Sequence, residues 1–167
     1  MPADEHRAHA PRHVRLFVVT VSDTRTPATD VGGETARTLC AAAGHEVVGS
    51  RIIKDDATAI AALVEEICAA GTADAVVLTG GTGLSARDTT YEALVPLLEK
   101  RLDGFGELFR TLSFQEIGAA AMLSRAVAGL RRGVLVFAIP GSPAAVRLAL
   151  ERLILPEVGH AVAEVRR

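Results

Sequence analysis

Two aspartates and a run of glycines are the residues of this chain whose types and positions could do chemistry. Gly80-Gly81-Thr82-Gly83 follows a short apolar run, and three glycines in four positions let a ligand approach bare backbone N–H groups. Asp88 follows this turn, and Asp55 follows an earlier apolar segment. Two carboxylates that face a phosphate-sized pocket repel an anion unless Mg²⁺ lies between them. This combination predicts magnesium-assisted phosphoryl or nucleotidyl transfer, in which catalysis is mainly positioning and charge stabilisation.

Two familiar phosphate loops fit the glycine turn poorly. A P-loop needs Lys and then Ser or Thr directly after its last glycine, and Leu84 and Ser85 occupy those positions. Residues 81–86 obey G-x-G-x-x-G/A, the dinucleotide fingerprint, with Asp103 about 20 residues further on. That fingerprint opens its helix within the glycines, whereas a capping box formed by Thr89 and Glu92 predicts a later helix start. The alternative without chemistry is a ligand-free turn flanked by unrelated capping or surface aspartates.

Further polar residues follow the first and last apolar segments. Ser22 and Asp23 follow the first, and Gly141 and Ser142 follow the last. Because the carboxyl ends of parallel strands meet at one edge of a sheet, we expect these residues to lie near the glycine turn. Ser22 and Asp23 could instead satisfy only local turn amides. Ser142 could bind a ligand, cap a helix that starts at Pro143, or do both.

The elements that must position these residues alternate between strands and helices. Strands are expected at residues 14–21, 46–53, 75–78, 125–130 and 134–139, the last two paired antiparallel. Helices are expected at residues 34–43, 57–70, 91–100, 107–117, 119–123 and 144–165, with a turn at 103–106. This order predicts an α/β fold, a three-layer α/β/α sandwich whose mostly parallel sheet carries an antiparallel strand.

Length, composition and charge narrow the class of protein. The chain has 167 residues, of which 49% are hydrophobic, but no apolar run approaches the ~20 residues of a membrane helix. No signal peptide is visible, so we expect a cytoplasmic protein. With 18 basic and 20 acidic residues and 4% aromatics, the chain lacks the basic excess and the rings that nucleic-acid binding requires. A small anionic ligand fits this composition.

The ends of the chain and its two cysteines complete the domain prediction. Residues 1–13 contain three histidines and two prolines without periodicity, so we expect a disordered tail, and residues 14–167 are expected to form a single domain. Cys40 and Cys68 sit in apolar helical patterns, which indicates small core residues in a reducing compartment.

Several blocks along the chain match, in order, the signature of one protein family. They are Thr79-Gly80-Gly81-Thr82-Gly83, Arg87-Asp88, Thr90, Glu92-Ala93 and Pro140-Gly141-Ser142-Pro143, with further similarity at residues 20–24, Asp30, Gly33, residues 104–107 and Ser124-Arg125. The set resembles the molybdenum-cofactor biosynthesis family that includes MoaB, MogA and the G domain of gephyrin. The resemblance covers residues 14–153, and the middle, 105–130, is closer to MoaB than to MogA.

The resemblance implies a specific reaction. Active members of the family transfer AMP from MgATP to molybdopterin, giving adenylylated molybdopterin and pyrophosphate. The family's two catalytic aspartates fall on Asp55 and Asp88, which would hold or orient Mg²⁺ and the triphosphate. Amides of Gly80–Gly83 would stabilise phosphate charge, and Thr82 or Ser142 would help to bind substrate. The other motif residues expected to contact substrate or nucleotide are Ser22, Asp23, Thr79, Arg87 and Gly141.

The resemblance also implies partners and leaves two alternatives. The family forms trimers or hexamers, so we expect a homo-oligomer, with a downstream metal-insertion protein as a further partner. Retention of Asp55 and the Arg87-Asp88 pair favours activity. One alternative is a catalytically inactive MoaB-like protein that only binds molybdopterin. The other is a nucleotide hydrolase, of the kind fused to related domains in competence-damage-inducible proteins.

Overall fold

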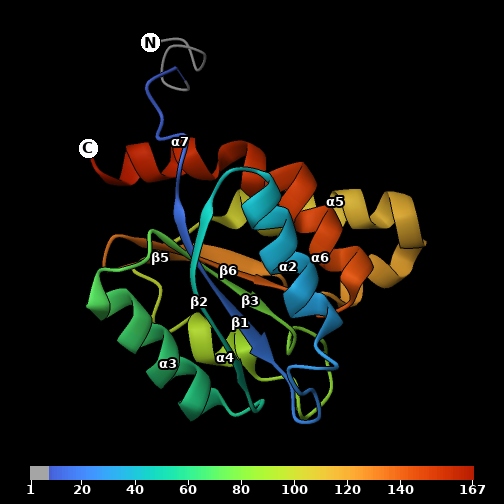
Figure 1. The fold of residues 1–167 in the computed structure, drawn as a ribbon. Helices are drawn as coiled ribbons and strands as arrows, with labels where there is room; N and C mark the ends of the chain where they lie inside the picture. Colours follow the sequence, from blue (N-terminus) through green and yellow to red (C-terminus); the bar gives the residue numbers. More distant parts are fainter. Residues whose placement is uncertain (1–7) are drawn as a thin grey trace.

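A six-stranded mixed sheet forms the middle layer of the protein (Figure 1). The structure is a computed structural model that describes residues 8–167. The strands are β1 (Arg15–Val21), β2 (Glu46–Ile53), β3 (Ala75–Thr79), β4 (Lys100–Arg101), β5 (Val127–Arg131) and β6 (Val134–Ile139). They lie in the order β2-β1-β3-β6-β5-β4, and the first four of these are mutually parallel.

The antiparallel part of the sheet lies at one edge. β5 pairs antiparallel with β6, as predicted, through a tight turn in which Arg132 and Gly133 have φ values of 50° and 74°. Two consecutive residues with positive φ match the twist that a two-residue hairpin needs. β4 pairs antiparallel with β5, with Lys100 opposite Leu130. The sequence pattern does not predict β4, because two residues are too few to show alternation.

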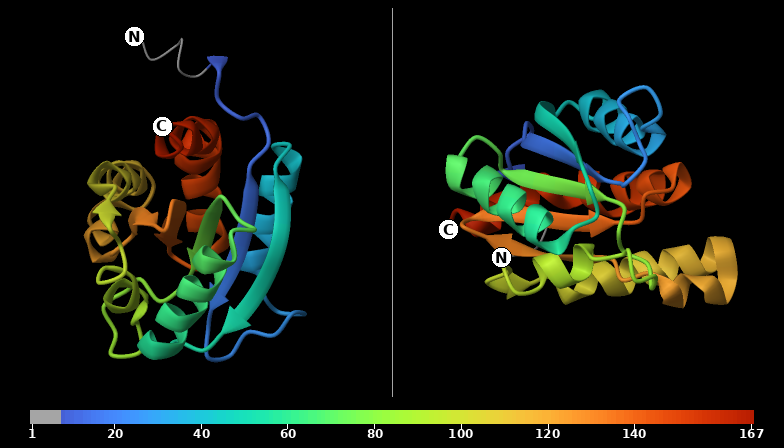
Figure 2. Two further views of the ribbon diagram at one scale, coloured as in Figure 1. Left: turned by 90° about the vertical axis from the view of Figure 1, so that its left-hand side faces the viewer. Right: turned by 90° about the horizontal axis from the view of Figure 1, so that it is seen from below.

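Helices cover both faces of the sheet, which confirms the three-layer α/β/α sandwich (Figure 2). On one face lie α2 (Val31–Ala42), α5 (Asp103–Ile117) and the continuous run α6 (Pro143–Ala149), η2 (Leu150–Ile154) and α7 (Leu155–Val165); α3 (Ala57–Ala70) and α4 (Thr90–Leu94) lie on the other. The 3₁₀ helix η1 (Gly118–Leu123) extends α5. Within residues 8–167, no helix has the length and apolar character to cross a membrane.

Strand residues alternate between two cores. Val18 packs with α2 and α6, whereas its neighbour Val19 packs with α3. Both valines are fully buried, as are the central residues of β3. Strands that are buried on both faces are typical of a parallel sheet between helical layers, so the unbroken apolar runs have their expected cause.

The helix expected at residues 91–100 is wrong beyond Leu94. Pro96 follows α4 closely, lacks a backbone N–H and clashes with the preceding turn, so the helix ends before it. The chain then joins the sheet as β4, where Glu99 also donates its backbone N–H to Leu130 O at 2.8 Å. Pairing with β5 therefore replaces the helical hydrogen bonds that the local pattern favours.

The turn expected at residues 103–106 is also wrong, because these residues are the first turn of α5. Phe105 and Phe109 are buried against the sheet, and this burial stabilises a helix here. Gly106 serves close packing: a Cβ atom at this position would lie 2.8 Å from Ala126 O. The glycine lets α5 approach β5, and its role is not to turn the chain.

The predicted tail falls partly outside the described residues. Residues 1–7 lie outside them, so a disordered segment there stays a prediction. Within the described part, His13 Nδ1 lies 2.6 Å from Gly44 O. The carbonyl oxygen of Pro11 would lie 2.4 Å from a Cβ atom on Gly159 of α7. Residues 11–13 therefore pack on the domain.

The glycine turn after β3 places α4 against the sheet. Gly80 and Gly81 have φ values of 99° and 71°. A Cβ atom on Gly80 would lie 2.3 Å from Val21 O, and one on Gly81 would lie 2.2 Å from Thr90 Oγ1. Thr90 donates its backbone N–H to Gly81 O at 3.1 Å and its hydroxyl to Gly80 O at 2.9 Å. The start of α4 is thus hydrogen-bonded directly to the turn.

We expect Gly81→Ala to lower the free energy of unfolding by about 1–3 kcal/mol, since alanine at positive φ is strained and its methyl group would meet Thr90. Gly104→Ala is the control, because no atom lies within 4 Å of a Cβ there and the residue is helical. This control should unfold as wild type or gain up to about 1 kcal/mol. Urea unfolding compares the two, and equal stabilities would contradict the close packing described for Gly81.

Candidate functional site

The carboxyl ends of the four parallel strands bring the predicted site residues to one edge of the sheet, which we call the rim. In chain order these are Ser22 and Asp23 after β1, Asp55 after β2, Gly80–Gly83 and Asp88 after β3, and Gly141 and Ser142 after β6. The connection after β1 leads to α2 on one face, and the connection after β3 leads to α4 on the other (Figure 2). β1 and β3 are adjacent, so the rim contains a topological switch point, the usual ligand position in open α/β sheets.

Asp55 joins the end of β2 to the start of α4. Its Oδ1 accepts hydrogen bonds from Thr89 N at 3.0 Å and Thr89 Oγ1 at 2.6 Å. The predicted capping box of Thr89 and Glu92 is therefore wrong, because Thr89 makes no side-chain cap. Glu92 instead forms an ion pair with Arg125. Asp55 thus accepts the Thr89 N–H that the Glu92 side chain would accept in a capping box, while Glu92 is held by Arg125.

Asp88 borders the same glycine turn as Asp55. Its Oδ2 accepts a hydrogen bond from Ser85 N at 2.9 Å and would lie 2.7 Å from a Cβ atom on Gly83. Asp55 Oδ2 would lie 2.8 Å from a Cβ atom on Gly81. Among residues 8–167, nothing donates a hydrogen bond to Asp88 Oδ1 or to Asp55 Oδ2. Each carboxylate thus uses one oxygen to hold the connection after β3, and its other oxygen has no donor among the described residues.

Asp23 and Arg87 form a pair across the rim. Asp23 Oδ2 accepts from Arg87 Nε at 2.9 Å, and its Oδ1 accepts from Asp55 N at 3.1 Å. The hydrogen bond from Arg87, and after it the one from the Asp55 backbone, holds the pKa of Asp23 below its usual value. Asp23 therefore cross-links the loops after β1, β2 and β3. The Arg87 side chain is 70% exposed, which leaves it room to turn toward a ligand.

The backbone amides of the glycine turn divide into two kinds. Gly80 N donates to Ile139 O at 2.9 Å, so this amide is already used by the sheet. No hydrogen bond within residues 8–167 uses the amides of residues 81–83. Three successive amides without acceptors are suited to an anion, since backbone N–H groups in turns form anion-binding concavities.

A recess opens at the switch point beside this turn. It has a volume of about 440 Å³, and it lies between the ends of β1, β3 and β6 and the start of α2; its lining includes Ser22, Asp30, Gly32, Thr79, Gly141 and Ser142. Thr79 is 1% exposed, and its Oγ1 is the buried side-chain polar atom that lacks a hydrogen-bond partner within residues 8–167. Such a group costs about 1–3 kcal/mol, so its position in the lining indicates a ligand that supplies the partner.

The start of α2 forms the wall of the recess opposite Thr79. Asp30 is 3% exposed, and its carboxylate accepts from Thr20 Oγ1 at 2.8 Å and from Gly33 N at 3.0 Å. A Cβ atom on Gly32 would lie 2.6 Å from Gly141 O. The helix therefore packs directly on the loop after β6. Asp30 and Gly33 match the family blocks, so the sequence marks these two residues. The match alone does not show that they form a wall of the recess.

The two serines of the rim both bond local amides. Ser22 Oγ accepts from Thr24 N at 3.2 Å and Arg25 N at 3.0 Å. Ser142 Oγ accepts from Ala145 N at 3.2 Å and caps α6. A hydroxyl that accepts from an amide still has its proton to donate, so both serines can cap and also bind a ligand.

Arg125 is the residue of the rim to which sequence reasoning assigns no role. It donates from Nε to Gly83 O at 2.9 Å and from Nη2 to Asp88 O at 3.1 Å. Thr82, which is 3% exposed, accepts a hydrogen bond from Arg125 N at 2.9 Å. The match of Ser124-Arg125 to the family blocks is the sequence signal that could have found this residue. Its contacts with the glycine turn and Asp88 span about 40 residues, so no local sequence pattern predicts them.

The cysteines lie away from the rim. Cys40 and Cys68 are both buried and free, and they belong to the cores on opposite faces of the sheet. Burial raises the pKa of each thiol to about 11, so neither is a ready nucleophile. Residues 8–167 contain no group of three or more His, Cys, Asp or Glu side chains that could hold a metal alone. Mg²⁺ fits the pair of open carboxylate oxygens, since it is typically bound by one or two carboxylates together with substrate phosphates.

Comparisons with known proteins agree with this geometry. Residues 17–160 match the family model described as "Probable molybdopterin binding domain". Molybdenum cofactor biosynthesis protein B of Halalkalibacterium halodurans is 48% identical over 99% of this chain and 98% of its own length. The crystal structure of the tungsten cofactor synthesizing protein MoaB from Pyrococcus furiosus has a TM-score of 0.85 at 38% identity and covers 95% of this chain and 100% of that one.

A structure of MogA is also similar, though less so, with a TM-score of 0.80 at 26% identity over 90% of this chain and 99% of that one. The greater similarity to MoaB agrees with the resemblance of residues 105–130 to that branch. The matched region contains the glycine turn, both aspartates and the recess that Thr79 lines. The chain belongs to the molybdopterin-binding family of MoaB and MogA, on its MoaB side, and has a role in molybdenum cofactor biosynthesis.

Proposed function

We propose that this protein transfers AMP from MgATP to molybdopterin and releases pyrophosphate, in the cytoplasm. The observation that carries the proposal is the position of Asp55 and Asp88. Both carboxylates border one glycine turn, and each keeps an oxygen without a donor in the described part of the chain. The unpartnered hydroxyl of Thr79 lines a recess beside them. A metal–nucleotide site next to an organic-ligand recess is the arrangement that this transfer needs.

The residues of the rim divide the work of binding. Asp55 and Asp88 would hold Mg²⁺, which when bound neutralises charge on the phosphates. The amides of residues 81–83 would hydrogen-bond phosphate oxygens as charge develops on them. Arg87, which now pairs with Asp23, would turn its exposed guanidinium toward the triphosphate.

The recess would hold the pterin. Its volume of about 440 Å³ lies in the usual range of ligand pockets. Thr79, Ser22, Ser142 and the backbone of Gly141 would hydrogen-bond the polar edge of the pterin. The terminal phosphate of molybdopterin would then face the nucleotide across Gly80. Because that phosphate oxygen attacks the α-phosphorus of ATP and pyrophosphate leaves, the protein needs to position the groups and supplies no nucleophile.

One assay separates this function from its alternatives. The protein is incubated with molybdopterin and MgATP, and adenylylated molybdopterin and pyrophosphate are followed together. A protein that only binds molybdopterin releases no pyrophosphate. A nucleotide hydrolase consumes ATP when no pterin is present. Transfer requires both substrates and gives the two products in equal amounts, after which the downstream metal-insertion protein would receive the adenylylated pterin.

Asp88→Asn should lower turnover at least about 100-fold, because it removes a charge that holds the metal–nucleotide while leaving the hydrogen bond to Ser85 possible. Asp56→Asn is the matched control. Asp56 neighbours Asp55 but caps α3 through Ala59 N at 2.8 Å, and asparagine caps equally well. Initial rates with both substrates test the difference. Normal turnover by Asp88→Asn would exclude the role given to this carboxylate.

Thr79→Val should raise the free energy of unfolding by up to about 1–3 kcal/mol, because it removes a buried hydroxyl that has no partner in the described structure. Molybdopterin affinity should fall roughly two- to tenfold, as one neutral hydrogen bond contributes about 0.5–1.5 kcal/mol. Thr90→Val provides the contrast, since it strips Gly80 O of its donor and should destabilise the fold. Urea unfolding and pterin titration check both variants, and equal destabilisation would show that Thr79 is not unpartnered.

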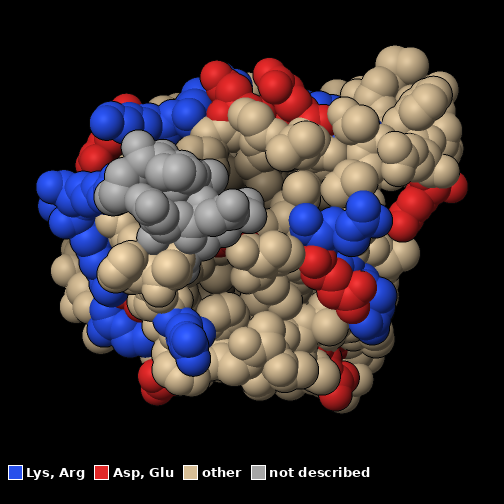
Figure 3. Space-filling view, turned by 90° about the horizontal axis from the view of Figure 1, so that it is seen from above, with Lys and Arg blue, Asp and Glu red and all other residues tan. Residues whose placement is uncertain are grey.

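We also propose that the protein is a trimer or hexamer joined through α5 and η1. These helices expose Leu108, Phe114, Ile117, Met122 and Leu123, with Met122 74% exposed. The lobe that they form, at the right of Figure 3, shows a mainly uncharged surface. Large apolar side chains that are exposed on neighbouring helices are typical of an interface, and a second copy of this chain is the occupant that the family implies.

Phe114→Glu should convert the oligomer to monomers, since it places a charge in the apolar patch of α5 and η1. Ala41→Glu, on the exposed side of α2, is the control and should leave the mass unchanged. Sedimentation velocity measures both. Wild-type protein that sediments as a monomer at micromolar concentration would refute the proposed assembly.

A further inference from the structure

One guanidinium group spans both ends of the loop that carries Asp88. Arg125, just before β5, donates from Nε to Gly83 O at 2.9 Å and from Nη2 to Asp88 O at 3.1 Å. The two acceptors are the first and last carbonyl groups of residues 83–88. The backbone N–H of Arg125 adds a hydrogen bond to Thr82 O at 2.9 Å. The loop is therefore held at its ends by a residue that follows it by about 40 positions.

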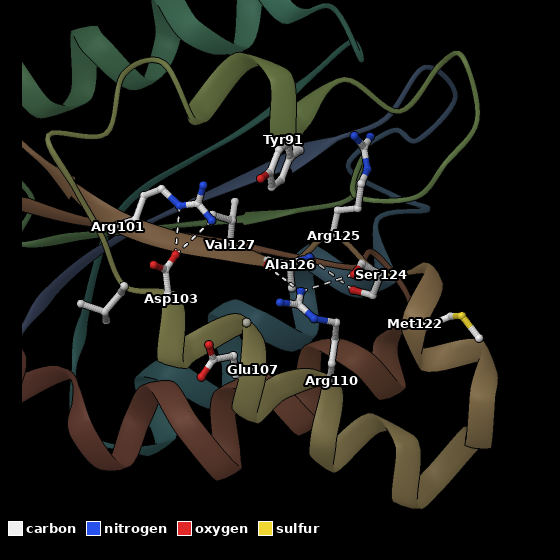
Figure 4. Close-up of a pocket in the computed structure, with 12 residues that line it drawn as sticks. Tyr91, Arg101, Asp103, Glu107, Arg110, Met122, Ser124, Arg125, Ala126 and Val127 are labelled. Atoms are coloured by element: carbon white, nitrogen blue, oxygen red, sulfur yellow. Dashed lines mark hydrogen bonds and ion pairs between the residues drawn. The ribbon is translucent and has the colours of Figure 1, made fainter.

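The same guanidinium is anchored on α4. Its Nη atoms pair with both carboxylate oxygens of Glu92, the second contact at 3.2 Å. The group also lies over the ring of Tyr91, 5.3 Å from the ring centroid. Figure 4 shows Arg125 turned to the side of Tyr91 and away from Arg110, which lies across a cavity of about 620 Å³. The side chain thus has one fixed orientation, set by an ion pair and a ring.

The loop has little support of its own. Its internal hydrogen bonds are local: Asp88 N to Ser85 O, Ser85 N to Asp88 Oδ2 and Arg87 N to Ser85 Oγ. Residues 84–87 are exposed, and the side chain of Leu84 has no core to enter at 65% exposure. Besides Arg125, the pair that Arg87 forms with Asp23 is the external side-chain contact described for these residues. An exposed loop with local bonds alone opens easily.

We propose that Arg125 is a positioning residue that places the Asp88 carboxylate at the glycine turn, which Asp55 also borders, for metal–nucleotide binding. The inference rests on the proposed function, in which both aspartates hold Mg²⁺–ATP. Arg125 fixes Asp88 through the backbone of the loop and touches no reacting group. Lysine cannot replace it. The planar guanidinium bonds two carbonyl groups and a carboxylate while it lies over a ring, whereas an ammonium group is a single point of charge that cannot make all of these contacts at once.

The test compares Arg125→Lys with Arg131→Lys. Arg131 lies at the other end of β5, pairs with Glu65 at 2.6 Å and also donates to a carbonyl, that of Leu97. Its side chain is 24% exposed against 25% for Arg125, so the two substitutions remove similar ion pairs from similar surroundings. Of these two arginines, Arg125 contacts the loop of Asp88 and Arg131 does not. Glu92→Gln is a milder second variant, which loosens the anchor but keeps both bonds to the carbonyl groups.

Two measurements are made on each variant. Binding of the Mn²⁺–ATP complex to the protein, with Mn²⁺ as the paramagnetic substitute for Mg²⁺, is followed by electron paramagnetic resonance and compared with Mn²⁺ and ATP without protein. Amide hydrogen exchange of the peptide that contains residues 83–90 reports the loop itself. Arg125→Lys should weaken Mn²⁺ binding about 10- to 100-fold, as loss of a supporting contact to a metal ligand does, and should speed exchange of the loop. Glu92→Gln should do both to a smaller extent, and Arg131→Lys should do neither.

The outcomes separate this inference from the proposed function. If wild-type protein with ATP does not bind Mn²⁺, the proposed function fails and the role of Arg125 fails with it. If wild type binds and Arg125→Lys binds equally well, the function stands and the positioning role is overturned. Equal weakening by Arg125→Lys and Arg131→Lys would also overturn it, since the effect would then be general loss of stability.

Discussion

The contact between the Asp55 carboxylate and Thr89 is the interaction on which the rim depends. It joins the end of β2 to the start of α4 across 34 residues. It also fixes the position of Thr89, which is the residue next to Asp88. One oxygen of the Asp55 carboxylate accepts this structural bond. The other lies beside Gly81 and has no donor among the described residues. The same carboxylate is therefore part of the fold and part of the proposed metal site. Asp88 repeats the arrangement with Ser85.

Gathering several carboxylates at one edge of a sheet is unfavourable unless each has a donor or a cation. Asp23 has Arg87 and the amide of Asp55, and Asp30 has Thr20 and the amide of Gly33. These bonds are charge-assisted and so stronger than neutral ones. The two bonds to Asp23 also lock the loops to one another, because their donors belong to other connections. Charge compensation and loop placement at the rim thus have the same cause.

The switch point explains why a recess lies beside these carboxylates. The connections after β1 and β3 depart to opposite faces, so no helix covers the gap between the ends of these strands. The buried hydroxyl of Thr79 faces that gap and has no partner among residues 8–167, an arrangement that destabilises the protein by about 1–3 kcal/mol. A turn that is mostly glycine lets the end of β1, the start of α4 and the loop after β6 approach it closely. Function at this edge is therefore obtained at some expense of stability.

Local rules were sufficient for the elements whose signals lie within a few residues. β2 at 46–53 and α3 at 57–70 agree with the sequence pattern to the residue, with Asp56 as N-cap and Gly71 at a φ of 69° as the stop. The glycine turn, the antiparallel hairpin and the three layers follow from patterns of the same range. The motif blocks, taken in order, also sufficed to identify the family.

Tertiary structure decided what depends on contacts between distant segments. Thr89 bonds Asp55 rather than Glu92, Arg125 reaches the loop of Asp88, and Gly106 serves packing on β5 where its sequence suggests a turn. Residues 95–101 leave the helical path because β5 offers them hydrogen bonds. The unpartnered state of Thr79 is likewise visible only when the strands on either side are in place. A linear pattern records the propensity of a segment, whereas these outcomes depend on acceptors and surfaces that folding brings from 34 to 42 residues away.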